Sequence, residues 1–143
     1  MVLWVFLLLI AQFLAGMAAN LWVQIPAHHP GVSGNYFVGT VRGVTWALRH
    51  GALLLQLHVL LGTVLGVLSV VLLIRALGRR RPYGFWWPLL GWVGVFGAGA
   101  NGASFLNYGH DFSSMLMSVG FALALLSYGM LLRRSPRPDR APA

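Results

Sequence analysis

Four long stretches without a single Asp, Glu, Lys or Arg side chain constrain this chain more than any other feature. They cover residues 1–41, 50–74, 82–110 and 112–132. Each contains enough apolar sequence for a helix that crosses a hydrocarbon core of about 30 Å. The stretches are apolar on every side instead of amphipathic, as expected of helices embedded in lipid. The sequence therefore predicts an all-α integral membrane protein.

Composition supports the same class of protein. Of the 143 residues, 58% are hydrophobic and 8% are charged, whereas soluble domains carry about 25% charged residues. So apolar a chain cannot form the polar surface of a soluble domain. Intrinsic disorder is also excluded, because it requires low hydrophobicity and high charge. The chain has no cysteine, which excludes thiolate metal sites, iron–sulfur clusters, disulfides and cysteine nucleophiles.

We expect four transmembrane helices in an antiparallel up-down bundle that forms a single domain, residues 1–143. The predicted helices cover about residues 2–23, 46–76, 85–106 and 112–132. A cleavable signal peptide over residues 1–19 is the alternative for the first helix. The apolar run is longer than a typical signal-peptide core and no basic side chain precedes it, which favours a retained helix. The tail, residues 135–143, is rich in Pro and Arg and is predicted to be disordered.

The first loop, residues 24–45, is too long for a tight turn. Its second half places Arg42, Thr45 and Arg49 at spacings of three and four residues, hence on one helical face. The pattern predicts either a short interfacial helix lying on the membrane or an early start of the second crossing.

Arginine counts indicate the orientation. Only Arg42 and Arg49 lie on the side of the first loop. The other side holds Arg75, Arg79, Arg80, Arg81, Arg133, Arg134, Arg137 and Arg140. The positive-inside rule then places both termini in the cytoplasm, and we expect the chain in the cell (plasma or inner) membrane. The formal charge of +8 therefore predicts that the cytoplasmic arginine clusters contact anionic lipid, and it does not indicate nucleic-acid binding.

Polar residues inside the predicted helices gather at one depth, in the outer leaflet. His58 is the central one, about 5 Å below the boundary if the second crossing is embedded from Leu55. Polar side chains in a membrane usually face the bundle interior or a cavity, so this layer is a candidate site. The layer is predicted to contain Asn20, Gln56, His58, Asn101, Ser104, Ser114, Met115 and Ser118.

Small residues at a spacing of four occur beside this layer. Gly62 and Gly66 share a stripe with His58, and the third predicted helix carries Gly94, Ala98 and Gly102. Such rows favour close helix packing, although they also leave a flat wall against which a planar cofactor fits. His58 is therefore expected to face another helix and not lipid.

Two interpretations of His58 follow. In the first, it is a buried neutral imidazole that bonds Asn101, Gln56 or a serine of a neighbouring helix. In the second, it is an axial ligand of haem b, with Met115 or His110 as the second ligand. His50 with His110 would form a shallower pair, whereas His50 and His58 lie about 12 Å apart along one helix and cannot share an iron.

The remaining ionisable residues carry weaker signals. His28, His29, His50 and His110 with Asp111 are nitrogen and oxygen ligands that suit zinc or copper, but their spacings match no ligand pattern. Asp111 is explained as a cap or first-turn acid of the fourth helix. No catalytic motif and no embedded carboxylate pair is present.

The sequence accordingly predicts a small polytopic membrane protein that is not an enzyme. The favoured function is an accessory, assembly or binding subunit of a larger membrane complex, or of a homo-oligomer. The alternative is an electron-transfer protein that binds haem b or a quinone through His58. The candidate site residues are His58, His110, Met115, His50 and Asn101.

Overall fold

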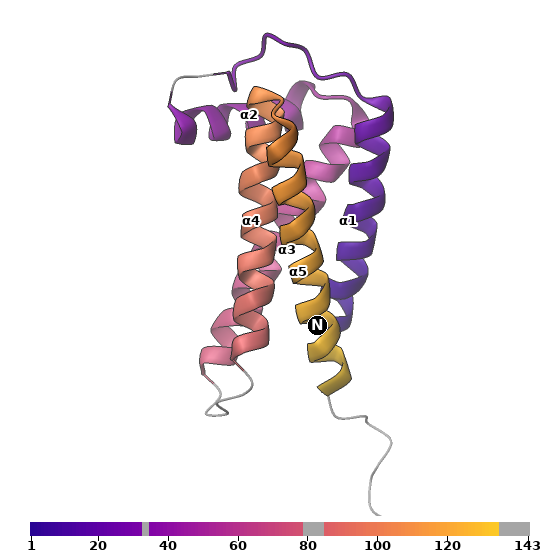
Figure 1. Cartoon of the computed structure of the whole chain (residues 1–143), viewed down its shortest axis with the longest axis vertical. Coiled ribbons are helices and arrows are strands. Elements are labelled where there is room, and N and C mark those ends of the chain that lie inside the picture. The colour runs from indigo at the N-terminus through magenta and orange to yellow at the C-terminus, as the bar shows by residue number, and fades with distance from the viewer. Residues whose placement is uncertain (33–34, 79–84, 135–143) are drawn as a thin grey trace, which may run out of the picture.

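The computed structural model describes residues 1–32, 35–78 and 85–134, and these residues form helices without any strand. The four longest helices are long and apolar enough to cross a membrane. They lie side by side, while a fifth, shorter helix crosses one end of them (Figure 1). The helices are α1 (Val2–Trp22), α2 (Tyr36–His50), α3 (Leu53–Leu77), α4 (Trp86–Tyr108) and α5 (Asp111–Arg134).

The region predicted as one helix over residues 46–76 is two helices. Gly51 and Ala52 both adopt extended backbone, with ψ of 160° and 150°, so the chain changes direction between α2 and α3. The first loop therefore does contain the short separate helix that its sequence allowed. Asn35 begins this helix because its side-chain oxygen accepts a hydrogen bond from Val38 N at 3.1 Å.

α4 and α5 are joined by only two residues, Gly109 and His110. Gly109 ends α4 with a φ of 66°, a left-handed conformation that glycine adopts without the steric cost of a side chain. Asp111 follows in the first turn of α5, where its carboxylate complements the helix dipole. The predicted position of this acid in the first turn is thus confirmed.

The most extensive helix contact is between α4 and α5. A Cβ atom at Gly94 would lie 2.6 Å from the backbone nitrogen of Ala124, and one at Gly120 would lie 2.7 Å from that of Ala98. These distances are too short for any side chain, so glycine at both positions lets the two backbones touch. The small-residue row predicted on α4 is therefore used for close helix packing.

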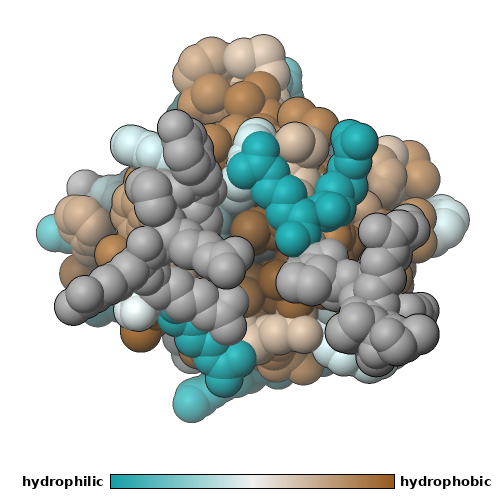
Figure 2. Space-filling model, turned by 90° about the horizontal axis from the view of Figure 1, so that it is seen from below, coloured by the Kyte–Doolittle hydropathy of each residue, from teal (hydrophilic) through white to brown (hydrophobic). Residues whose placement is uncertain are grey.

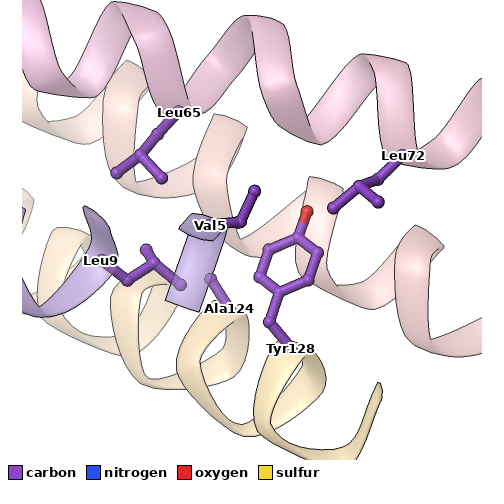
Figure 3. Packing of buried hydrophobic residues seen from close by; sticks show 6 residues of the cluster. All are labelled: Val5, Leu9, Leu65, Leu72, Ala124 and Tyr128. Atoms are coloured by element: carbon purple, nitrogen blue, oxygen red, sulfur yellow. The ribbon is translucent and has the colours of Figure 1, made fainter. Parts of the chain in front are cut away.

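The main apolar core lies where α1, α3 and α5 meet (Figure 3). Tyr128 is completely buried and its ring lies against Gly91 of α4, where a Cβ atom would be 2.6 Å from the ring. The core consists of Val5, Leu9, Leu65, Leu72, Ala124 and Tyr128. Few large side chains are buried in total, and many apolar side chains of α1 and α3 face outward.

The two ends of the four long helices differ in charge. We call the end crossed by α2 the α2 end, and the opposite end, where α3 and α5 finish, the arginine end. The described part of the arginine end carries Arg75, Arg133 and Arg134. Figure 2 views the molecule from this end and shows hydrophilic side chains over a largely hydrophobic body. Arg79–Arg81 and the predicted disordered tail, residues 135–143, lie outside the described residues.

Candidate functional site

His58 pairs with a residue of α1. Gln12 Nε2 lies 3.4 Å from His58 Nε2, which joins α1 to α3 by a side-chain hydrogen bond. With the amide nitrogen as donor, Nε2 is the acceptor and the proton of a neutral imidazole sits on Nδ1. His58 is thus turned toward another helix, as its glycine stripe indicated, but its partner is none of those predicted.

Two glycines make room for this pair, one on each helix. A Cβ atom at Gly16 of α1 would lie 2.7 Å from His58 Cε1, and one at Gly62 of α3 would lie 3.1 Å from Gln12 Nε2. Each polar side chain therefore lies four residues from the glycine of its own helix and occupies the space beside the glycine of the other. This reciprocal arrangement fixes the sliding register between the two helices.

The pair is not fully satisfied. His58 Nδ1 and Gln12 Oε1 are both buried and have no hydrogen-bond partner. A buried polar atom without a partner costs about 1–3 kcal/mol, so these two atoms lower the stability that the contact provides. We call Gln12, Gly16, His58 and Gly62 the α1–α3 polar contact.

The α1–α3 polar contact also shows which residue of α1 lies level with His58. Gly16, which faces His58, lies about 9 Å from the end of α1 at Trp22, and His58 lies about 8 Å from the start of α3 at Leu53. Asn20, which was expected at the level of His58, is exposed nearer the end of α1. The end of α1 and the start of α3 therefore lie at nearly the same level, and Asn20 lies about one helical turn closer to that end than Gly16 does.

The other candidate site residues point elsewhere. The side-chain nitrogen of Asn101 donates to Gly97 O of its own helix at 2.8 Å. Met115 is 53% exposed on α5. His50 and His110 are exposed at the α2 end. His58 itself faces Gly16 and Gln12 of α1, and the predicted haem ligand pairs remain untested.

The polar layer on α4 and α5 is largely satisfied locally. Ser113 Oγ donates to Ser104 Oγ at 3.2 Å between the two helices. Ser118 Oγ donates to Ser114 O one turn earlier in α5, at 3.1 Å. These hydroxyls are therefore bonded either to the neighbouring helix or to the backbone of their own helix.

No metal centre is assembled within residues 1–32, 35–78 and 85–134, where no three His, Asp or Glu side chains lie close enough to hold an ion. His29 has a different role. Its Nε2 lies 3.0 Å from Leu106 O, its Nδ1 accepts a hydrogen bond from Gly31 N at 3.1 Å, and its ring stacks on Trp46 with 4.8 Å between centroids. His29 thus anchors the first loop to α4 and α2.

A buried polar residue, Asn107, lies beneath that loop. Its side chain is 5% exposed, and neither its oxygen nor its nitrogen has a hydrogen-bond partner. Its oxygen lies where a Cβ atom of either Gly31 or Gly43 would be. The loop, α2 and α4 therefore meet at a single carboxamide, which packs against glycine Cα–H groups.

Sequence reasoning missed Gln12, Gly16 and Asn107. Gln12 is the only polar side chain between Met1 and Phe13, and Gly16 follows it by four residues. That isolated pair in an apolar helix was a usable signal of a buried contact. For Asn107 no such signal existed, because it adjoins a turn, where asparagine is common on the surface.

Comparison with protein-family models, with curated proteins and with solved structures finds no match to this chain.

Proposed function

We propose that the protein spans the cell membrane four times as an antiparallel up-down bundle, with the arginine end and both termini in the cytoplasm. Two tryptophans support the span of α1. Trp4 and Trp22 are exposed near its two ends, and 18 residues of helix cover about 27 Å, close to the thickness of a hydrocarbon core. Tryptophans at these depths are typical of membrane interfaces.

The proposed role is that of a non-enzymatic accessory or assembly subunit of a larger membrane complex. One observation carries it: the imidazole of His58 fills the space beside Gly16 and bonds Gln12. The one histidine within a long helix is thereby used to join α1 to α3. A polar contact that fixes the register of two helices suits a structural subunit, which acts by presenting a defined surface to its partner.

The surface of α1 is the proposed docking face for another membrane subunit. Between its two end tryptophans it exposes a row of large apolar side chains, and α1 is joined to the other helices mainly through α3. The row consists of Leu7, Ile10, Phe13, Leu14, Met17 and Leu21.

Haem binding remains the second candidate, and one observation favours it. His58 Nδ1 is a buried ring nitrogen without a partner, so the residue keeps an unused coordinating or hydrogen-bonding atom. The residues around it fit a haem poorly, however, because Gly16 and Gln12 already pack against the imidazole. A bound haem would require α1 to separate from α3 at this level.

One preparation tests both candidates. We would purify the tagged chain from its native membranes in mild detergent and record an oxidised-minus-reduced visible spectrum. We expect no Soret band that shifts on reduction. A Soret band that disappears in His58→Ala would establish the haem alternative and overturn the accessory role.

The accessory role itself is tested by photocrosslinking in those membranes. A crosslinking amino acid at Leu14, which is 61% exposed, should capture one defined membrane protein in stoichiometric amount. The matched control is the same amino acid at Leu9, which is 2% exposed on the same helix and should capture no other protein. Crosslinks from Leu14 to lipid alone would contradict a subunit contact at this face.

A further inference from the structure

α2 presents three different faces. One face is buried against α3 and α4 and is made of small residues at a spacing of four: Gly39, Gly43 and Ala47. This face explains how a helix can lie so close across the others. The remaining two faces are exposed, and their side chains differ in chemistry.

The second face of α2 is an apolar stripe. Phe37, Val41 and Leu48 follow one another at spacings of four and seven residues, which places them on one side of the helix. Phe37 is 79% exposed and Val41 is 67% exposed. We call these three residues the α2 apolar stripe.

The third face carries the only two arginines of this end. Arg42 and Arg49 are seven residues apart, so they share a side of α2, and both are exposed. Among the described residues the only acidic side chain is Asp111, in the first turn of α5. The α2 end therefore carries an excess of positive charge next to an apolar stripe, which is the composition of a helix that lies in a membrane interface.

The level of α2 along the long helices can be read from its contacts. Tyr36 OH donates to Ala100 O at 2.9 Å, and Ala100 precedes the last residue of α4 by eight residues, about 12 Å. Farther along α2, Gly43 lies against Asn107, close to the end of α4. The first turn of α2 thus lies beside apolar turns of α4 and does not project beyond its end (Figure 1).

We infer that α2 is seated in the outer boundary between hydrocarbon and headgroups, where Arg42 and Arg49 bind the phosphodiester of an anionic glycerophospholipid. The α2 apolar stripe then lies among the acyl chains. This inference rests on the proposed membrane topology, which puts lipid at the level of Ala100. A soluble protein partner does not suit the stripe as well, because Phe37 and Val41 would have to remain in water until it bound.

Depth is the first test, and the absence of cysteine makes single-cysteine labelling direct. Spin labels at Val41→Cys, Thr45→Cys and Val67→Cys would be compared in phosphatidylcholine–phosphatidylglycerol vesicles. Val67 is 60% exposed in the middle of α3 and reports membrane insertion. Thr45 is exposed and lies at the border between the arginine face and the α2 apolar stripe, three residues after Arg42 and four before Arg49. Oxygen, which partitions into lipid, and a water-soluble nickel complex would serve as relaxation agents.

The three labels separate the inference from the proposed topology. We expect Val67 and Val41 to favour oxygen and Thr45 to favour nickel. Nickel access at Val67 would overturn the membrane topology and the inference together. Oxygen access at Val67 with nickel access at Val41 would overturn only the seating of α2 in the membrane. The α2 apolar stripe would then be assigned to a water-soluble partner.

Lipid binding is the second test. Photoactivatable phosphatidylglycerol, incorporated into the same vesicles with the full-length chain, should label residues 36–50. Arg42→Gln with Arg49→Gln should weaken that labelling about fivefold per arginine. Arg133→Gln with Arg134→Gln, at the arginine end, is the matched control and should leave it unchanged. Equal labelling in the α2 variant, or equal competition by phosphatidylcholine, would overturn the lipid site.

Discussion

The imidazole of His58 on α3 occupies the volume that a side chain at Gly16 on α1 would need. A Cβ atom at Gly16 would lie 2.7 Å from His58 Cε1 and 3.0 Å from Nδ1. No real Cβ atom tolerates such a distance, so the histidine and the glycine depend on each other. This dependence can be tested without knowledge of what the protein binds.

Gly16→Ala should destabilise the contact between α1 and α3. The new methyl group must displace the imidazole of His58 or separate the helices, and overpacking of this kind costs about 1–3 kcal/mol. The free energy of unfolding would be measured by titration with sodium dodecyl sulfate in detergent micelles. Gly66→Ala on α3 is the matched control, since a Cβ atom there meets nothing within 4 Å. Equal loss in both variants would contradict the packing role of Gly16.

Gly120→Ala should be more damaging than Gly16→Ala. The atoms that its Cβ would meet, Ala98 N at 2.7 Å and Gly94 O at 2.8 Å, belong to the backbone of α4 and cannot rotate away. We expect a loss of at least about 3 kcal/mol or failure to fold. Gly97→Ala on α4 meets nothing within 4 Å and should retain wild-type stability in the same titration. Wild-type stability of Gly120→Ala would show that the two backbones are farther apart than described.

Gln12 and His58 should be energetically coupled, but weakly. The single variants Gln12→Leu and His58→Leu and the double variant form a double-mutant cycle. Because the hydrogen bond is long at 3.4 Å, and because such bonds average about 0.6 kcal/mol in membranes, we expect a coupling of about 0.5–1 kcal/mol. A coupling of zero would mean that the two side chains act only by filling space. Asn101→Leu, whose amide bonds its own helix, should show no coupling to His58.

Gly43→Ala should release α2 from the other helices while leaving the four long helices folded. The added methyl group would overlap the side-chain oxygen of Asn107. Hydrogen exchange of the backbone amides of residues 36–50 should accelerate by about tenfold or more, whereas amides of α3 should not change. Thr45→Ala, on the exposed side of α2, should leave the exchange rates within about twofold of the wild type. Unchanged exchange in Gly43→Ala would contradict the docking of α2 on Asn107.

The four long helices were predictable because they depend on local composition. An uninterrupted apolar stretch without charged side chains predicts a helix of spanning length whatever its neighbours are. The glycine row of α4 was equally readable, since small residues at a spacing of four allow close approach to any partner helix. The sequence did not indicate that α5 would be that partner through Gly120 and Ala124.

The sequence predicted the break between α2 and α3 only as one of two alternatives. The sequence allowed a short interfacial helix or an early start of the crossing, because Gly51 alone does not force a helix to end. The structure has two residues of extended backbone there. Burial of Gly39, Gly43 and Ala47 against α3 and α4 requires α2 to turn away from the axis of α3, and that packing is tertiary.

The sequence by itself therefore determined the number of long apolar helices, their approximate ends except for the start of α3, and the sign of the charge at each end. Only the tertiary structure decided that His58 would meet Gln12 and that Asn107 would be covered by Gly31 and Gly43. The physical reason is that these contacts depend on the depth and rotation of each helix relative to its neighbours. Periodicity gives the face of one helix, but the sliding register between two helices is set by the side chains that fill each other's gaps.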